Sequence, residues 1–445
     1  MDIGELAKFK WILILELAFA GAYVSITRGL FVIFLVSTGY AIEGISFVML
    51  VSAAIAVLIG GLINRYPSFI INNVKTKVIA FHGLERLMWF FIPILSDPLF
   101  VLIFYSIFMI FSFFVSVFMN FTVYGSLDEV DLKDILAKRS AVGGASSIIG
   151  FVLGVFLLAF LPMEGKFIYI FSIGAVIGLL STFVVMFLNL AHLEGAPLPK
   201  GVEQPEKVFS TSLFFVILLT GGNLLGIIWI PYLMDYLKGP DYLAASMGLL
   251  ATVASIGASL VWRGKSLKTL RTSHILSALS PLIIWFTTFP SFHLIISAFN
   301  SFVYTGANFL GNFLFAKYKD WFGAVRSSIL LAILGNAAIL LAAPMGMIIK
   351  QDYILAFSTI FIILIISVLF TSLGIPEVAV VSEETARTYS FILYRNSLTG
   401  YNVSVEISKE TALVTLKLLT TSLVLIALYV IYRLLTIIMA RAILI

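Results

Sequence analysis

Cysteine is absent from the 445 residues of the chain. Its absence excludes disulfides, thiolate metal sites and cysteine nucleophiles, but leaves the compartment of the loops open. Charge is also scarce, because only 11% of the residues are Asp, Glu, Lys or Arg. By contrast, 61% are hydrophobic and the mean hydropathy is +1.09. So little polar surface cannot cover a soluble protein of this length, and the composition predicts an integral membrane protein.

Enzyme signatures are missing as well. Gly264-Lys265-Ser266 resembles the end of a phosphate-binding loop, but the glycine required five positions earlier is Ser259. The histidines have no spacing suited to a metal site; they are His82, His192, His274 and His293. We therefore expect no enzyme, no cofactor and no metal. The net charge of +5 is spread over the ends of apolar runs, which argues against a nucleic-acid partner.

Apolar runs long enough to cross the ~30 Å core of a bilayer recur along the chain. They predict twelve spans up to residue 373, at about 11–37, 42–63, 76–95, 99–123, 138–161, 167–190, 209–234, 242–262, 273–289, 292–316, 325–348 and 353–373. A further run at 412–432 either crosses the bilayer or lies in its interface.

Basic residues divide unequally between the two sets of loops. The side that holds the N-terminus carries seventeen Lys and Arg residues, against three on the other side. Because cytoplasmic loops are enriched in Lys and Arg, we expect a multi-pass protein of the cell membrane with a cytoplasmic N-terminus.

A strip of polar residues runs along the tenth span. Its members are spaced four apart and are Asn300, Tyr304, Asn308 and Asn312. Steps of four residues drift by only ~40° around a helix, so the strip stays on one face. The same spacing occurs 188 residues earlier, in the fourth span, at Ser112, Ser116, Asn120 and Tyr124. Such groups cannot face lipid cheaply, so we expect them to line a wet cavity or to act as glue between helices.

The repeat predicts two halves. A segment with Pro197, Pro199 and Pro205 separates the sixth from the seventh span. We expect an all-α membrane protein of two six-helix bundles related by a pseudo-twofold axis, followed by a hairpin and an extra helix. The predicted parts are a first bundle at 1–190, a linker at 191–208, a second bundle at 209–375, a polar tail at 376–411 and a further helix at 412–445.

After the second span, Gly60-Gly61-Leu62-Ile63-Asn64-Arg65 is similar to the Gly-x-Leu-x-Asp-Arg signature of the major facilitator superfamily. With the topology and the repeat, the first 375 residues or so resemble that family of transporters. The resemblance implies a cytoplasmic gate that involves Asn64, Arg65 and Arg263. Asn64 stands where the family has an acid, and the alternative is that Arg65 and Arg263 anchor helix ends at lipid headgroups.

The resemblance also implies a central cavity lined by the first, fourth, seventh and tenth spans. The polar strips independently favour the fourth and tenth. The candidate substrate-binding residues are Tyr23, Thr27, Arg28, Ser112, Ser116, Asn120, Asn223, Asn300, Tyr304 and Asn308.

Ionisable residues interrupt the first and third spans. Arg28 requires an acidic partner, water or an anionic ligand, and the plain alternative is a structural pair with Glu16 or Glu85. His82 and Glu85 lie one helical turn apart, with Arg86 beside them. Since burial favours a protonated carboxyl and a nearby Arg opposes it, the candidates for proton coupling are Glu16, His82, Glu85 and Arg86.

The chain after the twelfth span changes in character. Residues Ser390 to Ile407 alternate in polarity around Thr399-Gly400, which predicts two short strands. Overall we expect a monomeric secondary transporter in the lipid bilayer that moves a small solute by alternating access, with protons as the leading coupling ion. The alternative is a membrane scaffold or assembly subunit whose tail recruits a partner.

Overall fold

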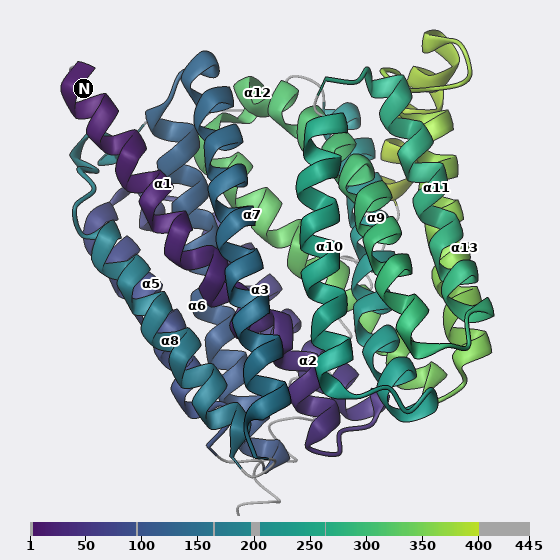
Figure 1. The fold of residues 1–445 in the computed structure, drawn as a ribbon. Helices are drawn as coiled ribbons and strands as arrows, with labels where there is room; N and C mark the ends of the chain where they lie inside the picture. The colour runs from purple at the N-terminus through teal and green to yellow at the C-terminus, as the bar shows by residue number, and fades with distance from the viewer. Residues whose placement is uncertain (1–2, 95–96, 163–164, 197–204, 263, 400–445) are drawn as a thin grey trace, which may run out of the picture. The chain divides into compact units, whose positions relative to one another are not determined.

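The computed structural model describes residues 3–94, 97–162, 165–196, 205–262 and 264–399, and these parts of the chain contain helices and no strands. The helices are α1 (Ile3–Ile26), α2 (Arg28–Ser37), α3 (Ile42–Arg65), α4 (Ser68–Ile71), α5 (Val74–Phe91), α6 (Pro98–Ser126), α7 (Glu129–Phe160), α8 (Lys166–Val185), η1 (Ala191–Leu193), α9 (Pro205–Pro231), η2 (Tyr232–Tyr236), α10 (Asp241–Trp262), α11 (Leu267–Phe286), η3 (Pro290–Phe292), α12 (His293–Ile349) and α13 (Tyr353–Gly374). Figure 1 shows their course.

Local sequence explains where several helices begin. The side chain of Asp97 accepts a hydrogen bond from the Leu99 N–H at 2.9 Å, and Pro98 occupies the first turn of α6. The side chains of Asp128 and Asp352 cap α7 and α13 in the same way. A carboxylate at this position satisfies an N–H that has no partner inside the helix. Acidic and proline residues between apolar runs therefore mark the helix starts.

Three of the predicted spans differ from separate, unbroken helices. The first is broken at Thr27 into α1 and α2, next to Arg28. The tenth and eleventh run together as α12, with a sharp bend at Gly323, whose φ of 71° is accessible to glycine. Within the described residues, nine segments are long and apolar enough to cross a membrane. The protein is thus a multi-pass membrane protein.

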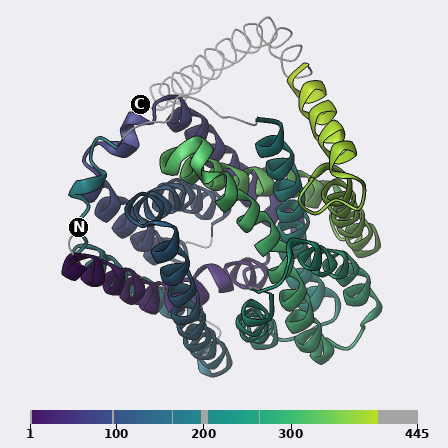
Figure 2. The ribbon, with the colours of Figure 1, turned by 90° about the horizontal axis from the view of Figure 1, so that it is seen from above.

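The helices of residues 3–387, one compact unit, pack in a repeated pattern. In the first half α5 contacts α6 and α8, and α1 contacts α7 and α8. In the second half the corresponding contacts join α11 to α12 and α13, and α9 to α12 and α13. Figure 2 shows, from above, the purple-to-blue helices of the first half gathered apart from most of the teal-to-green helices of the second. This equivalence confirms the two bundles with a pseudo-twofold relation.

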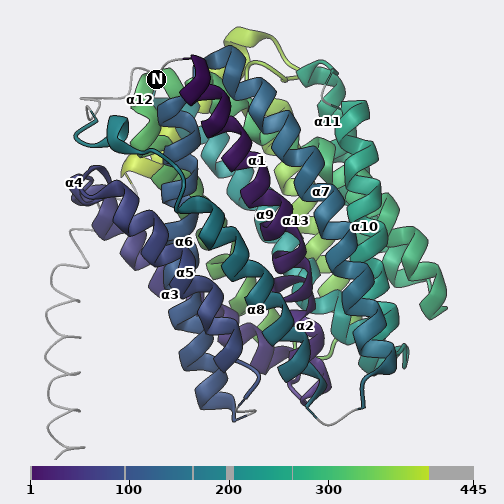
Figure 3. The same cartoon turned by 60° about the vertical axis from the view of Figure 1, so that its left-hand side comes forward.

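Two seams join the bundles, and they too are equivalent. One lies between α7 and α10, which stand side by side in Figures 1 and 3. The other lies between α3 and α12. Glycines allow close approach in both, since a Cβ at Gly144 would lie 2.7 Å from Ile256 and one at Gly60 would lie 2.6 Å from Ile333. Each bundle therefore contributes its second and fifth spans to the seams.

The described part of the tail differs from the prediction. Residues 383–399 are helical, so the strand predicted to start at Ser390 is wrong. The segment contains the continuous apolar run Phe391 to Tyr394, and periodicity does not distinguish a strand from a helix for so short a run. The second predicted strand, from residue 400, and the predicted helix at 412–445 lie outside the described residues.

Candidate functional site

Six charged side chains meet inside the first bundle, and most of them are buried. We call this group the buried charge cluster; its members are Glu16, Arg28, His82, Glu85, Arg86 and Arg139. They come from α1, α2, α5 and α7, helices that are separate in the sequence (Figure 3). All four residues predicted to couple protons are among them. Charges in this environment are held only where partners compensate them.

Glu16 lies at one end of the buried charge cluster. One carboxylate oxygen accepts a hydrogen bond from Arg139 Nη2 at 3.1 Å, and the other lies 3.5 Å from His82 Nε2. The opposite ring nitrogen of His82 is 2.9 Å from the Thr182 hydroxyl of α8. Glu16 therefore has a guanidinium partner on one oxygen and an imidazole neighbour on the other.

Glu85 lies at the other end and is fully buried. Arg28 Nη2 donates to one of its carboxylate oxygens, and Arg86 Nη1 donates to the other. The pairing with Glu85 settles which acid accompanies Arg28. The charge of Arg28 is only partly neutralised, because the same carboxylate also pairs with Arg86.

Arg28 differs from the other members in its accessibility. Its side chain is 38% accessible, against 0% for its partner Glu85. Its guanidinium stacks 4.9 Å from the ring centroid of Phe108 on α6. It also begins α2, directly after the break at Thr27. Arg28 is therefore the member of the cluster whose cation is most open to a further partner.

Two other candidates on the same span are placed differently. Tyr23 and Thr27 are completely buried. They pack on glycines of α8, since a Cβ at Gly178 would lie 2.7 Å from Tyr23 and one at Gly174 would lie 2.6 Å from Thr27. The Thr27 hydroxyl donates to the Tyr23 carbonyl at 2.7 Å. Both residues are thus enclosed within the first bundle, where the Tyr23 ring lies 5.0 Å from the Arg86 guanidinium.

The polar strip of α12 makes few contacts with partners. Asn300, Tyr304 and Asn308 are half-buried, Asn312 is exposed, and Asn308 Oδ1 is enclosed with no hydrogen-bond partner among the described residues. The Tyr304 hydroxyl reaches Gly222 of α9, beside Asn223. The strip is therefore not hydrogen-bonded to neighbouring helices within the described part of the chain.

A second polar stripe on α12, which the sequence analysis did not identify, forms hydrogen bonds to α10. Its members, also four apart, are Ser297, Ser301 and Thr305. Ser301 donates to the Ala251 carbonyl of α10 at 2.7 Å, and Thr305 lies 3.0 Å from the Ser255 hydroxyl. Serine and threonine at four-residue spacing were the available signal. The two adjacent stripes show that α12 separates a bonded polar face from an unbonded one.

The polar strip of α6 is open in a similar manner. Ser112 and Asn120 are half-buried and Ser116 is exposed, and none of the three has a hydrogen-bond partner within the described residues. Phe108, whose ring contacts the Arg28 guanidinium, lies one helical turn before Ser112. The strip therefore begins one helical turn from the phenylalanine that the Arg28 guanidinium contacts.

The predicted gate is placed only in part. Asn64 and Arg65 are exposed at the end of α3, and the Arg65 guanidinium lies 5.8 Å from the Tyr66 ring centroid. Arg263 lies outside the described residues. The gating and lipid-anchoring roles of Arg65 both stay predictions.

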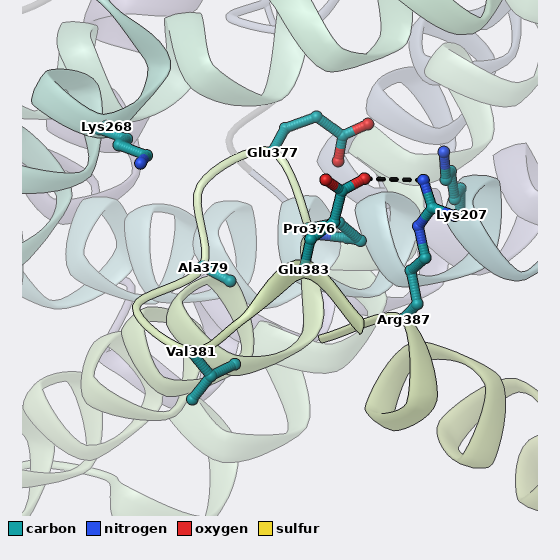
Figure 4. Close-up of a pocket in the computed structure, with 8 residues that line it drawn as sticks. All are labelled: Lys207, Lys268, Pro376, Glu377, Ala379, Val381, Glu383 and Arg387. Carbon is teal, nitrogen blue, oxygen red and sulfur yellow. Dashed lines mark hydrogen bonds and ion pairs between the residues drawn. The ribbon is translucent and has the colours of Figure 1, made fainter. Parts of the chain in front are cut away.

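Figure 4 shows a half-open pocket of about 530 Å³ at the end of the second bundle where α9 and α11 begin. Lys207, Lys268 and Glu377 line it, together with the ion pair of Glu383 and Arg387 at 2.7 Å. None of the residues that line this pocket belongs to a polar strip. Among the described residues no group of His, Asp and Glu side chains could hold a metal ion.

Sequence reasoning missed several partners in the site. Arg139, Thr182 and Phe108 complete the buried charge cluster and its surroundings. Arg139 carried a signal, a basic residue near the start of an apolar run. Thr182 and Phe108 carried none, because hydroxyls and phenylalanines are common throughout the spans.

Comparisons with known proteins address the fold. No family model and no curated protein sequence matches the chain. Solved structures do. The nucleoside transporter NupG is 15% identical over 83% of this chain and 97% of its own, with a TM-score of 0.56. A bacterial homolog of the human lysosomal transporter Spinster is 12% identical over 82% and 95%, with a TM-score of 0.55. The human organic anion transporter MFSD10 is 11% identical over 82% and 99%, with a TM-score of 0.58. The chain thus has the fold of major facilitator superfamily transporters.

Proposed function

We propose that this protein is a secondary active transporter, without enzymatic activity, that moves a small solute across the membrane by alternating access of its two bundles. The observation that carries the proposal is the polar strip of α12, which has no hydrogen bonds to neighbouring helices among the described residues; a second unbonded strip lies on α6. Polar groups left without partners inside a membrane protein require water or a ligand. The solved structures with this fold are described as transporters, which supports the same conclusion.

The seams support the rocking motion that alternating access needs. Glycines at Gly144 and Gly60 let the bundles approach closely without side chains locking between them. A scaffold would instead use its polar residues to bond helices together, as the Ser301 stripe does with α10. The strip of Asn308 has no such bonds within the described residues, which favours transport.

Proton coupling belongs to the same proposal, through Glu16 or Glu85. Protonating Glu85 would deprive two buried guanidiniums of their partner, whereas protonating Glu16 deprives only Arg139. His82 beside Glu16 offers a second proton site within 3.5 Å. Glu16 is therefore the better placed of the two carriers, and Glu85 is better suited to hold Arg28 in position.

Transport in proteoliposomes tests the proposal. A screen of radiolabelled metabolites should identify a solute whose accumulation follows an imposed pH gradient. Glu16→Gln should abolish the response to the gradient while exchange of solute across the membrane continues, because exchange needs no net proton movement. Glu383→Gln, at an exposed ion pair, is the matched control and should behave as wild type. Unaltered pH coupling in Glu16→Gln would remove that residue from the mechanism.

A further inference from the structure

The buried charge cluster contains more positive than negative charge. Its acids are Glu16 and Glu85, and its guanidiniums are those of Arg28, Arg86 and Arg139. No other carboxylate pairs with these three arginines among the described residues. His82 does not reduce the excess, since it is either neutral or positive. One positive charge is therefore left without a counter-charge inside the bundle.

The excess belongs to the Glu85 end of the cluster. Glu16 and Arg139 pair one to one, whereas Glu85 divides its two oxygens between two guanidiniums. Of these, Arg86 has a side chain that is only 5% exposed, against 38% for Arg28. Of the two guanidiniums that share Glu85, Arg28 is thus the one open to a further counter-ion, which an incompletely paired charge inside a membrane protein favours.

The surroundings of Arg28 leave one edge of its guanidinium for a ligand. The Phe108 ring covers one planar face of the guanidinium, and Nη2 donates a hydrogen bond to Glu85. The other N–H groups donate to no protein group in the described part of the chain. A planar fork with free donors suits a carboxylate or a phosphate, either of which accepts two parallel hydrogen bonds.

The polar strip of α6 continues along the helix from Phe108, the residue that covers the Arg28 guanidinium. Ser112 lies one turn from Phe108, with Ser116 and Asn120 beyond it, all accessible and unbonded within the described residues. A ligand whose acidic group reached Arg28 could place neutral polar groups along these hydroxyl and amide side chains. We infer that the transported solute is an organic anion, bound through its carboxylate or phosphate group by Arg28. The inference rests on the proposed transport function.

Binding to the purified full-length protein tests the charge requirement. The probes are acetate, benzoate and phenyl phosphate, each compared by thermal shift and calorimetry with a neutral counterpart, acetamide, benzamide and phenol. We expect at least one acid to bind and its neutral counterpart to bind at least ~10-fold more weakly, as the loss of a charge-assisted pair implies. The carboxylates and the phosphate separate the two acid classes. Neutral compounds that bind as well as the acids, or no response to any acid, would overturn the inference, and so would chloride binding that matches the organic acids.

Variants assign the site. Arg28→Gln should weaken acid binding by ~10-fold or more, and Arg28→Lys should restore part of it. Lys75→Gln removes an exposed charge and is the matched control. If Arg28→Gln fails to fold, the comparison of acids with their neutral counterparts on the wild-type protein still decides whether binding requires a negative charge on the ligand. Proteoliposome uptake of a neutral solute only would refute the anion inference and leave transport intact, whereas anion binding without uptake would refute transport and leave the site.

Discussion

At the scale of single residues, partner choice in the buried charge cluster decides what each charge can do. Arg28 could have paired with Glu16 or Glu85 on sequence grounds. It pairs with Glu85, and Glu16 is left to Arg139 and His82. This division separates a rigid, doubly bonded acid from one that has a titratable neighbour. The chemistry of the site depends on that separation more than on the mere presence of charges.

A double-mutant cycle measures the Glu16–Arg139 pair. Glu16→Gln and Arg139→Gln should each lower stability by about 3 to 5 kcal/mol, because each leaves a charge buried without its partner. The double variant should lose less than the sum, with a coupling of about 0.5 to 3 kcal/mol. Denaturation of detergent-solubilised protein followed by circular dichroism gives the three values. Additive losses would mean that the two side chains do not interact in solution.

At the scale of the helix, α12 has one polar face that is hydrogen-bonded to a neighbouring helix and another that is not bonded within the described residues. The face with Ser301 is bonded to α10, whereas the face with Asn308 has an enclosed amide oxygen with no partner among the described residues. Helical periodicity predicted the Asn308 strip. It could not say which of two neighbouring polar faces would be bonded, because that depends on where α10 lies. Contact with another helix made the difference.

Substitutions on the two faces of α12 should have opposite effects. Ser301→Ala removes a hydrogen bond between helices and should lower stability by about 0.6 kcal/mol, with transport near wild type. Asn308→Ala removes an unbonded group, so stability should hold or rise slightly while transport of the solute falls. Thermal unfolding and uptake assays on the same preparations measure both. Equal stability losses on the two faces would contradict the separation.

At the scale of the whole molecule, the two bundles meet through equivalent seams and, within the described part of the chain, through an ion pair. Lys166 at the start of α8 and Asp241 at the start of α10 form a bridge between bundles, and both side chains are largely buried. It lies at the membrane side opposite to the start of α1, where α2 ends and α10 begins (Figure 1). Opening of that side would have to break it.

Asp241→Asn should shift the protein toward opening at the side of this bridge. Asparagine keeps the shape of Asp241 but removes the attraction to Lys166. Because the chain has no cysteine, spin labels can be placed at Thr38→Cys and Gln351→Cys alone, one in each bundle. We expect the Asp241→Asn variant to gain a population with a longer distance between labels. An unchanged distribution would show that the bridge does not restrain opening.

The sequence by itself determined the multi-pass fold of two bundles and the positions of the polar strips along it. These follow from hydrophobic length, proline-rich linkers and a period near 3.6 residues, which act locally along the chain. Tertiary structure decided that Glu85 holds Arg28, that Arg139 meets Glu16 and that Ser301 bonds α10 while Asn308 stays open. It also decided that residues 390–399 form a helix and not a strand. The reason is that partners come from helices distant in sequence, and which groups meet depends on packing that no local pattern records.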